Sequence, residues 1–256
     1  MITYQARRTK QSGFTLPELL ISLVLGLTLV GAVMTAYLTA LKSSGDNNEQ
    51  AQLTHNLRAS LDLILSDLKR AGGVSPQDLD DDPGDLTSVR LLPESWDEQF
   101  DLYRDNPFVD AESNLRLWNC NGANECPCVT YSYDLDRDDD PYTGKMNHFG
   151  FKLSGTRLQI RTGSAVASGG PHPGCGYDNP SNTWEALTED DIQITQFSVS
   201  YIDGDGNIIA APEEINVPGG GRLQERNLQV TISGTKDEFS LTVTGKVRVR
   251  NDRYIP

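Results

Sequence analysis

Histidine and basic residues are scarce in this sequence. Its three histidines, His55, His148 and His172, leave few candidates for general bases or zinc ligands, and none lies beside a nucleophile motif. We therefore expect no enzymatic activity. The 22 lysines and arginines face 36 acidic residues, so the formal net charge is −14 at pH 7. A surface this acidic repels phosphates and anionic lipids, which argues against a broad nucleic-acid-binding face.

Long apolar stretches are also few. Hydrophobic residues make up 37% of the 256 residues and the mean hydropathy is −0.43, which excludes a polytopic membrane protein and fits one large domain or two small ones. The single long run, residues 19–41, contains no charged residue. As a helix it would be about 34 Å long, enough to cross a bilayer. Basic residues precede it and acidic residues follow, which predicts a cytoplasmic start and an exported remainder.

The start of this run has an unusual boundary. Gly13 is followed by Phe-Thr-Leu-Pro-Glu, which places the carboxylate of Glu18 at the entrance of a membrane-spanning helix. A charge in that position is costly and normally has a partner. An ordinary secretory signal peptide fits poorly, because its apolar region is shorter and ends at a small-x-small cleavage site.

The segment GFTLPELL, after a short basic leader and before a long apolar helix, resembles the cleavage and methylation site of type IV prepilins and type II secretion pseudopilins. The resemblance implies that a prepilin peptidase cuts between Gly13 and Phe14 and methylates the new amino group of Phe14. It also implies that Glu18 pairs with the Phe14 amine of a neighbouring subunit as helices stack into a filament. A carboxylate in the first turn of a helix is favoured by the helix dipole, which is consistent with this position.

A second apolar pattern follows the polar residues 42–50. Its members recur at three- and four-residue steps and are Leu53, Leu57, Leu61, Ile64, Leu65 and Leu68. This spacing predicts an amphipathic helix that ends at Gly72-Gly73, so residues 14–71 are predicted to form one long helix. Residues 60–72, with their Asp-Leu pairs and Arg-Ala-Gly ending, are similar to the end of the long helix in PilW-type minor pilins.

Strand patterns accumulate only in the second half of the chain. Six segments are rich in Val, Ile, Thr, Tyr and Phe at period two: 129–133, 149–153, 157–161, 192–202, 228–233 and 239–250. A helix followed by strands predicts an α+β fold with an antiparallel sheet, covered by the leucine face of the long helix. This is the type IV pilin-like fold that the resemblance implies. We expect irregular loops over residues 74–127.

These patterns predict four consecutive regions. Residues 1–13 are the leader, 14–41 the transmembrane helix, 42–72 the amphipathic helix that continues into the globular domain, and 73–256 a periplasmic α+β domain. The protein is thus expected in the inner membrane with a single span, and afterwards in a pilus at the cell surface.

Four cysteines lie on the predicted exported side, Cys120, Cys126, Cys128 and Cys175, and an even number there predicts two disulfides. A bond between Cys126 and Cys128 is disfavoured, because a single residue separates them in an extended chain. We expect Cys120 to pair with Cys126 or Cys128, and the remaining cysteine to reach Cys175. A zinc site with His172 is disfavoured by the ligand spacing and by an oxidising compartment.

Two acidic segments are candidate calcium loops, and calcium is the only cofactor that the sequence suggests. Their candidate ligands are Asp134, Asp136 and Asp138 in the first, and Asp203, Asp205 and Asn207, followed by Glu214, in the second. In the second segment Ile208 stands where a calcium loop needs glycine, and Asp-Gly is a strong turn signal, so we expect a hairpin turn between strands 199–202 and 208–210. The first segment is either a calcium loop or a solvated acidic loop.

Together these features predict a PilW-type minor pilin that takes part in type IV pilus assembly, in a priming or tip complex. The expected partners are other minor pilins, the major pilin, prepilin peptidase, and the inner membrane with its assembly machinery. The alternatives are a minor pseudopilin of a type II secretion system, or a surface adhesin or DNA-uptake pilin. For DNA the only basic cluster is Lys246, Arg248, Arg250 and Arg253, and alternation puts the first three on one solvated strand face.

Overall fold

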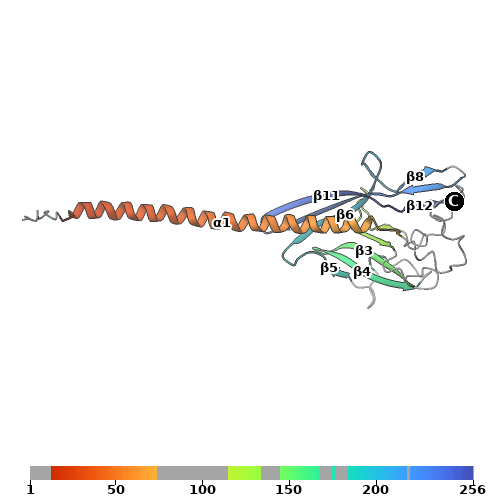
Figure 1. The fold of residues 1–256 in the computed structure, drawn as a ribbon, viewed down its shortest axis with the longest axis horizontal. Helices are drawn as coiled ribbons and strands as arrows, with labels where there is room; N and C mark the ends of the chain where they lie inside the picture. The colour runs from red at the N-terminus through yellow and green to blue at the C-terminus, as the bar shows by residue number, and fades with distance from the viewer. Residues whose placement is uncertain are drawn as a thin grey trace, which may run out of the picture. The chain divides into compact units, whose positions relative to one another are not determined.

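The computed structural model describes residues 13–73, 115–133, 145–167, 174–176, 184–217 and 220–255. The chain divides into two compact units, Met1–Glu49 and Gln50–Pro256. Within the described ranges it forms one long α-helix and three antiparallel sheets (Figure 1). The predicted α+β architecture, with a long amino-terminal helix, antiparallel sheets and disulfides in the loops, is therefore confirmed.

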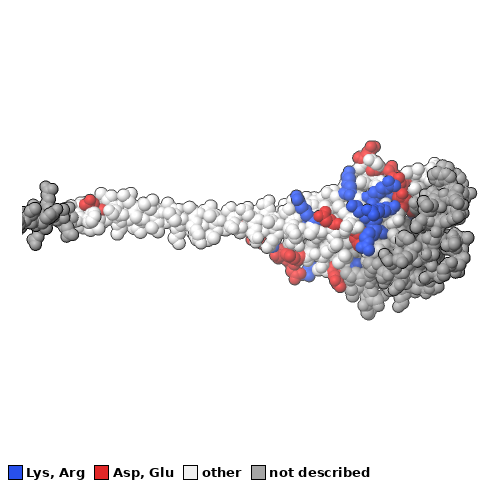
Figure 2. Space-filling view, viewed as in Figure 1, with Lys and Arg blue, Asp and Glu red and all other residues white. Residues whose placement is uncertain are grey.

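Helix α1 (Leu16–Leu68) passes the polar residues and Gly45 without interruption, as the predicted single long helix requires. In the first unit its large apolar side chains between Leu19 and Leu41 are 52% to 68% exposed. Figure 2 shows this part of the helix almost uniformly white, with an acidic group near its start. A helix that is apolar on all sides is stable in lipid or against other helices. Helix α1 is long and apolar enough to cross a membrane.

The second unit begins within the same helix and buries one face of it. Leu53, Leu57, Ile64 and Leu68 are at most 1% exposed and belong to the hydrophobic core, which confirms the predicted leucine face. The helix packs closely on the four-stranded sheet. A Cβ built on Gly245 would lie 2.5 Å from Cδ1 of Leu65.

The five-stranded sheet has the order β1-β2-β3-β4-β5. Its strands are β1 (Arg116–Trp118), β2 (Cys128–Ser132), β3 (Lys145–Ser154), β4 (Arg157–Ala167) and β5 (Trp184–Ala186). Every residue of β2 is buried, so this strand is covered on both faces. Strand β1 lies where we expected only irregular loops. That expectation is wrong at these three residues, because β1 is defined by its antiparallel pairing with β2 and not by a pattern of its own.

The four-stranded sheet has the order β11-β10-β6-β7. Its strands are β6 (Gln193–Ile202), β7 (Ile208–Ile209), β10 (Asn227–Lys236) and β11 (Phe239–Arg248). Strand β10 alternates strictly between buried and partly exposed residues, which is the period-two pattern that predicted it. Strand β11 ends two residues before the predicted 250, so Arg250 lies beyond the strand that exposes Lys246 and Arg248.

A small three-stranded sheet has the order β12-β9-β8. Its strands are β8 (Glu213–Asn216), β9 (Arg222–Glu225) and β12 (Arg253–Ile255). Strand β8 is exposed throughout, and Glu214 forms an ion pair with Arg222 on β9 at 2.5 Å. This sheet was not predicted from the sequence.

The two disulfides match one of the two expected arrangements. Cys120 bonds to Cys126, which we call the short disulfide, and Cys128 bonds to Cys175, which we call the long disulfide. The short disulfide closes the turn between β1 and β2. The long disulfide holds residues 174–176 against β2, and the backbone oxygen of Cys175 accepts a hydrogen bond from Nζ of Lys152 on β3 at 3.2 Å.

Candidate functional site

The amino-terminal motif forms the first turn of α1. The backbone oxygen of Thr15 accepts hydrogen bonds from the N–H groups of Glu18 at 3.1 Å and of Leu19 at 3.2 Å. The Oε2 atom of Glu18 accepts in turn from the Thr15 N–H and from its hydroxyl, both at 3.4 Å. Thr15 and Glu18 therefore cap the helix. The Thr-x-x-Glu spacing of a capping box could have revealed this role of Thr15, which the sequence analysis missed.

The bond between Gly13 and Phe14 directly precedes this cap. Phe14 is 78% exposed, and no atom lies within 4 Å of a Cβ built on Gly13. No described residue covers the backbone at this bond. The bond directly before the helix is therefore accessible to a peptidase on these residues.

Glu18 itself has no ion pair among the described residues, although it stands at the start of an uncharged apolar segment. Its Oε1 atom carries no hydrogen bond to a described group, and the two bonds to Oε2 are long. An ionised carboxylate in lipid is costly when it lacks a cation. The geometry leaves the carboxylate of Glu18 free to form an ion pair with a cation of another molecule.

Four hydroxyl side chains within the apolar segment are already satisfied by the helix itself. Each donates to a backbone oxygen three or four residues earlier, at 2.7 to 2.9 Å: Ser22, Thr28, Thr35 and Thr39. Such internal bonds remove the cost of placing a hydroxyl in hydrocarbon. Glu18 is the one charged residue on residues 16–41, and the helix satisfies its carboxylate only in part.

The other end of α1 is held by a buried polar contact. The hydroxyl of Tyr131 donates to Oδ2 of Asp67, and the hydroxyl of Tyr133 donates to Oδ1 at 3.0 Å. Arg70 lies 3.7 Å from Asp67 Oδ1 and its guanidinium stacks over the Tyr133 ring at 4.4 Å. Burial, together with the carboxylate of Asp67, raises the pKa of both tyrosines well above the ordinary value, so both remain hydroxyl donors.

The residues that follow complete this anchor. Gly72 adopts a left-handed φ of 74° and its N–H donates to the backbone oxygen of Ser132 at 2.8 Å. The carboxamide of Asn251 donates to the backbone oxygen of Ala71 at 3.2 Å, and Ala71 is fully buried. The Asp-Leu-Lys-Arg-Ala-Gly segment singled out in the sequence therefore joins the helix end to β2 and to the carboxyl-terminal region.

The acidic segment at Asp203 forms the predicted hairpin turn. Strands β6 and β7 pair in antiparallel register, and the two carboxylate oxygens of Asp203 accept hydrogen bonds from Asn207, from its N–H at 2.7 Å and its carboxamide at 2.9 Å. Those bonds hold the pKa of Asp203 below its ordinary value. Since Glu214 pairs with Arg222 on another sheet, the ligands of a twelve-residue calcium loop do not converge, and the interpretation of this segment as a turn is the one that fits.

The remaining metal candidates receive no support from the structure. Asp134, Asp136, Asp138 and His172 lie outside the described residues. Within the described ranges no group of three or more His, Cys, Asp or Glu side chains lies together in a way that could hold a metal ion.

Comparison with known families identifies both parts of the chain. Residues 8–34 match the prokaryotic N-terminal methylation motif, and residues 46–250 match the family described as prepilin peptidase-dependent protein B. Neither a curated protein nor a solved structure matches significantly. The second match spans most of the chain, and the first covers the capped helix start described above. The chain therefore belongs to the prepilin peptidase-dependent protein B family and is a type IV pilin-like protein, anchored to the membrane by one apolar helix.

Proposed function

We propose that this protein is a minor pilin of the PilW type, which enters a priming or tip complex of a type IV pilus after cleavage between Gly13 and Phe14. The observation that carries the proposal is the carboxylate of Glu18, which has no ion pair with a described residue and stands at the start of an exposed apolar helix. In this proposal cleavage and methylation create an amine at Phe14, and Glu18 binds the equivalent amine of a neighbouring subunit.

The geometry of the first turn supports this pairing. Thr15 occupies one oxygen of Glu18 through long hydrogen bonds, which leaves the other oxygen for an incoming cation. An ammonium group next to a carboxylate in lipid neutralises a charge that would otherwise be costly, so the pairing fixes the axial position of one helix against the next. Gly26 and Gly31 have open space around them, and small residues let helices approach closely.

The proposed role within the filament is supported by residues at the other end of the helix. Residues 60–72 resemble the PilW-type pattern. The structure gives Asp67 and Gly72 of that pattern hydrogen bonds to β2, and Arg70 a cation–π contact with Tyr133, which directly follows β2. We infer an assembly role without catalysis, with the globular unit in the periplasm and with other pilins and the inner-membrane machinery as partners. A minor pseudopilin of a type II secretion system shares the same amino-terminal chemistry and is the alternative.

The test is Glu18→Ala in the full chain, expressed in a host that has its own pilus machinery. We expect the variant to insert and to be cleaved, with a methylated Phe14 detected by mass spectrometry, but to be missing from sheared filaments and from copurified pilin complexes. Asp62→Ala serves as the matched control, because it removes an exposed acid from the same helix outside the apolar segment.

Three results would contradict the proposal. Normal incorporation of Glu18→Ala would show that the carboxylate is not needed for assembly. An intact leader on the wild-type protein, or cleavage at another bond, would remove the amine on which the pairing depends. Recovery of the wild-type chain with secretion pseudopilins, and not with pilins, would assign it to the alternative system.

A further inference from the structure

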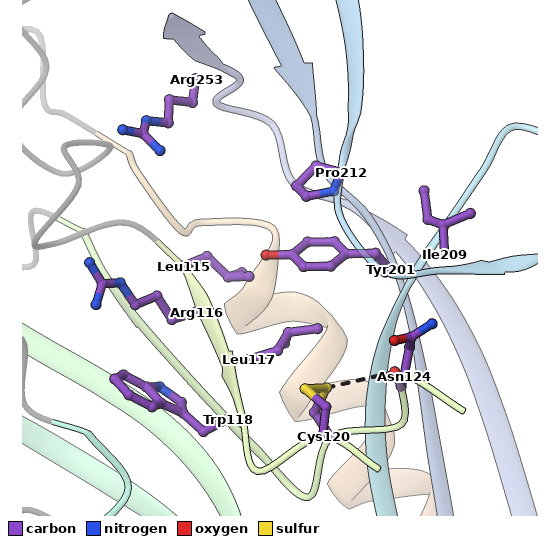
Figure 3. Close-up of a pocket in the computed structure, with 12 residues that line it drawn as sticks. Leu115, Arg116, Leu117, Trp118, Cys120, Asn124, Tyr201, Ile209, Pro212 and Arg253 are labelled. Carbon is purple, nitrogen blue, oxygen red and sulfur yellow. Dashed lines mark hydrogen bonds between the residues drawn. A yellow bond between two sulfur atoms is a disulfide. The ribbon is translucent and has the colours of Figure 1, made fainter. Parts of the chain in front are cut away.

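A pocket with a volume of about 400 Å³ opens between strand β1, the turn closed by the short disulfide, and the β6–β7 hairpin (Figure 3). Arg253 of β12 completes its rim, so three separate chain segments form it: residues 115–126, residues 201–212 and Arg253. Sites for small organic ligands typically have volumes of about 300–1,000 Å³ and combine apolar walls with a few polar groups. The proposed assembly function makes no use of this pocket.

One wall of the pocket is rigid. The short disulfide ties the two ends of the turn, and the side-chain oxygen of Asn121 accepts hydrogen bonds from the N–H groups of Ala123 at 2.9 Å and Glu125 at 3.0 Å. Cys126 also exchanges two backbone hydrogen bonds with Val199 of β6, at 3.0 and 2.9 Å. This wall is therefore fixed to the opposite one, and a ligand would bind without the cost of ordering it.

Apolar side chains form part of the pocket wall and alternate with polar ones. Leu115 is buried, Leu117 packs against the core, and Ile209 and Pro212 lie on the opposite side. The indole N–H of Trp118 donates to the hydroxyl of Thr130 at 2.7 Å, which fixes the orientation of the ring. These walls suit an aliphatic or aromatic group.

Among the described residues that line the pocket, the charged ones are Arg116 and Arg253, in a chain with a large excess of acids. Figure 3 shows the two side chains extending toward the same side of the pocket. Arg253 forms no ion pair or side-chain hydrogen bond with any described residue, and Arg116 lies 5.9 Å from the centre of the Trp118 ring. A planar guanidinium matches the geometry of a carboxylate.

A neutral donor lies between the apolar walls. The Tyr201 ring crosses the pocket with its hydroxyl toward Leu115 (Figure 3), and the hydroxyl has no hydrogen bond to a described group. Burial raises the pKa of Tyr201 to about 12, against the opposing effect of the nearby Arg226, so the hydroxyl stays protonated at neutral pH. It can therefore donate to an anion beside Arg253.

We propose that this pocket binds an organic carboxylate that bears an apolar group, with the apolar group against Leu117 and Trp118 and the carboxylate on Arg253. The hydroxyl of Tyr201 provides a second hydrogen bond. Two sources offer this chemistry: a small free acid, or an acidic residue next to an apolar one in an extended peptide segment. The pocket lies in the second unit and does not depend on leader processing or on Glu18.

The experiment uses the full chain in detergent micelles, with N-acetyl-L-leucine as the probe. The indole N–H signal of Trp118, identified by its loss in Trp118→Phe, is followed by ¹H–¹⁵N spectroscopy during titration. We expect a saturable shift with N-acetyl-L-leucine and none with the neutral N-acetyl-L-leucinamide. Comparison with a blocked Gly-Asp-Leu-Asp-Gly peptide separates the sources, since the tighter ligand identifies the form that the pocket prefers.

Variants locate the binding site. Arg253→Gln is expected to raise the dissociation constant about tenfold, because it replaces a charged hydrogen-bond donor with a neutral one. Arg250→Gln, an exposed arginine outside the pocket with the same change in charge, is expected to leave it unchanged. Ala210→Phe, at an exposed lining position, is expected to fill the pocket and abolish binding without lowering the unfolding temperature.

The absence of a shift with both probes would overturn the proposal. So would equal binding of the amide, or equal effects of Arg253→Gln and Arg250→Gln, because either result would show that the guanidinium on the rim does not select a carboxylate.

Discussion

Replacement of Tyr131 by phenylalanine tests the anchor at the end of α1. The hydroxyl of Tyr131 is fully buried and donates to Asp67, whose side chain is 15% exposed, so the variant removes one charge-assisted hydrogen bond without changing the shape of the core. The ring keeps its stacked contacts with Phe149 and Phe151. The loss should therefore come from the hydrogen bond alone.

The magnitude follows from what Asp67 retains. A hydrogen bond to a charged group contributes about 1.5–3 kcal/mol to stability. Asp67 keeps the hydroxyl of Tyr133 at 3.0 Å and the guanidinium of Arg70 at 3.7 Å, so it is not left without partners. We therefore expect the free energy of unfolding to fall by about 2 kcal/mol. For a unit of roughly 200 residues this lowers the unfolding temperature by about 4–8 °C.

The assay is thermal unfolding of the full chain in detergent, followed by near-ultraviolet circular dichroism, which reports the packing of the buried aromatic rings. Tyr201→Phe is the matched control, since the hydroxyl it removes has no hydrogen bond to a described residue, and it should stay within about 0.5 kcal/mol of the wild type. An unchanged unfolding temperature for Tyr131→Phe, or an equal fall for Tyr201→Phe, would refute the reasoning.

Two further predictions concern the same unit. Three tyrosines, Tyr131, Tyr133 and Tyr201, have a raised pKa in the folded state. Above pH 10 the unfolded chain loses the protons of these tyrosines while the folded state keeps them. Their contribution to the free energy of unfolding is therefore fully present below pH 10 and falls as the pH rises toward 12. Each such tyrosine contributes about 1.4 kcal/mol per pH unit, and Tyr131→Phe should show a slope smaller by that amount in urea unfolding at pH 11–12. The disulfides should differ in effect, because the short one spans 6 residues and the long one 47. Replacing both cysteines by alanine should cost about 2 kcal/mol for the short bond and about 4 kcal/mol for the long one in the same assay, and equal losses would contradict the chain-entropy argument.

The sequence was sufficient where structure follows from a local pattern. The apolar run and the leucines at three- and four-residue steps predicted α1, because burial of one helix face needs that spacing and no other information. All six expected strands are present, because the period-two pattern that predicted them is also local. The strands that were missed have three or four residues, and β8, with two glutamates and no buried residue, has no pattern to recognise. Such strands are set by their partners and not by their own residues.

The anchor shows a different limit. The resemblance of residues 60–72 marked Asp67 and Arg70 as members of a pattern, but it did not supply the reason for it. Their partners, Tyr131 and Tyr133, lie 64 and 66 residues away from Asp67 in the sequence. Periodicity and spacing describe neighbours along the chain, so they identify the helix face that must be buried without identifying the polar groups that meet it.

The disulfides depend partly on local spacing and partly on long-range pairing. The pocket, which one of them helps to form, was not predicted from the sequence. Sequence spacing left Cys120 with two possible partners, and the register of the β1–β2 pair decided between them. Trp118 pairs with Cys128, and continuing that antiparallel register by two residues places Cys120 opposite Cys126. Closure of this turn creates a rigid wall, but the pocket exists only because β6, β7 and β12 reach the same place through long-range pairing. The motif at Gly13–Glu18 is contained in six consecutive residues and can be read directly. A binding site assembled from three distant segments leaves no comparable signal, and its chemistry becomes visible only when the sheets are in register.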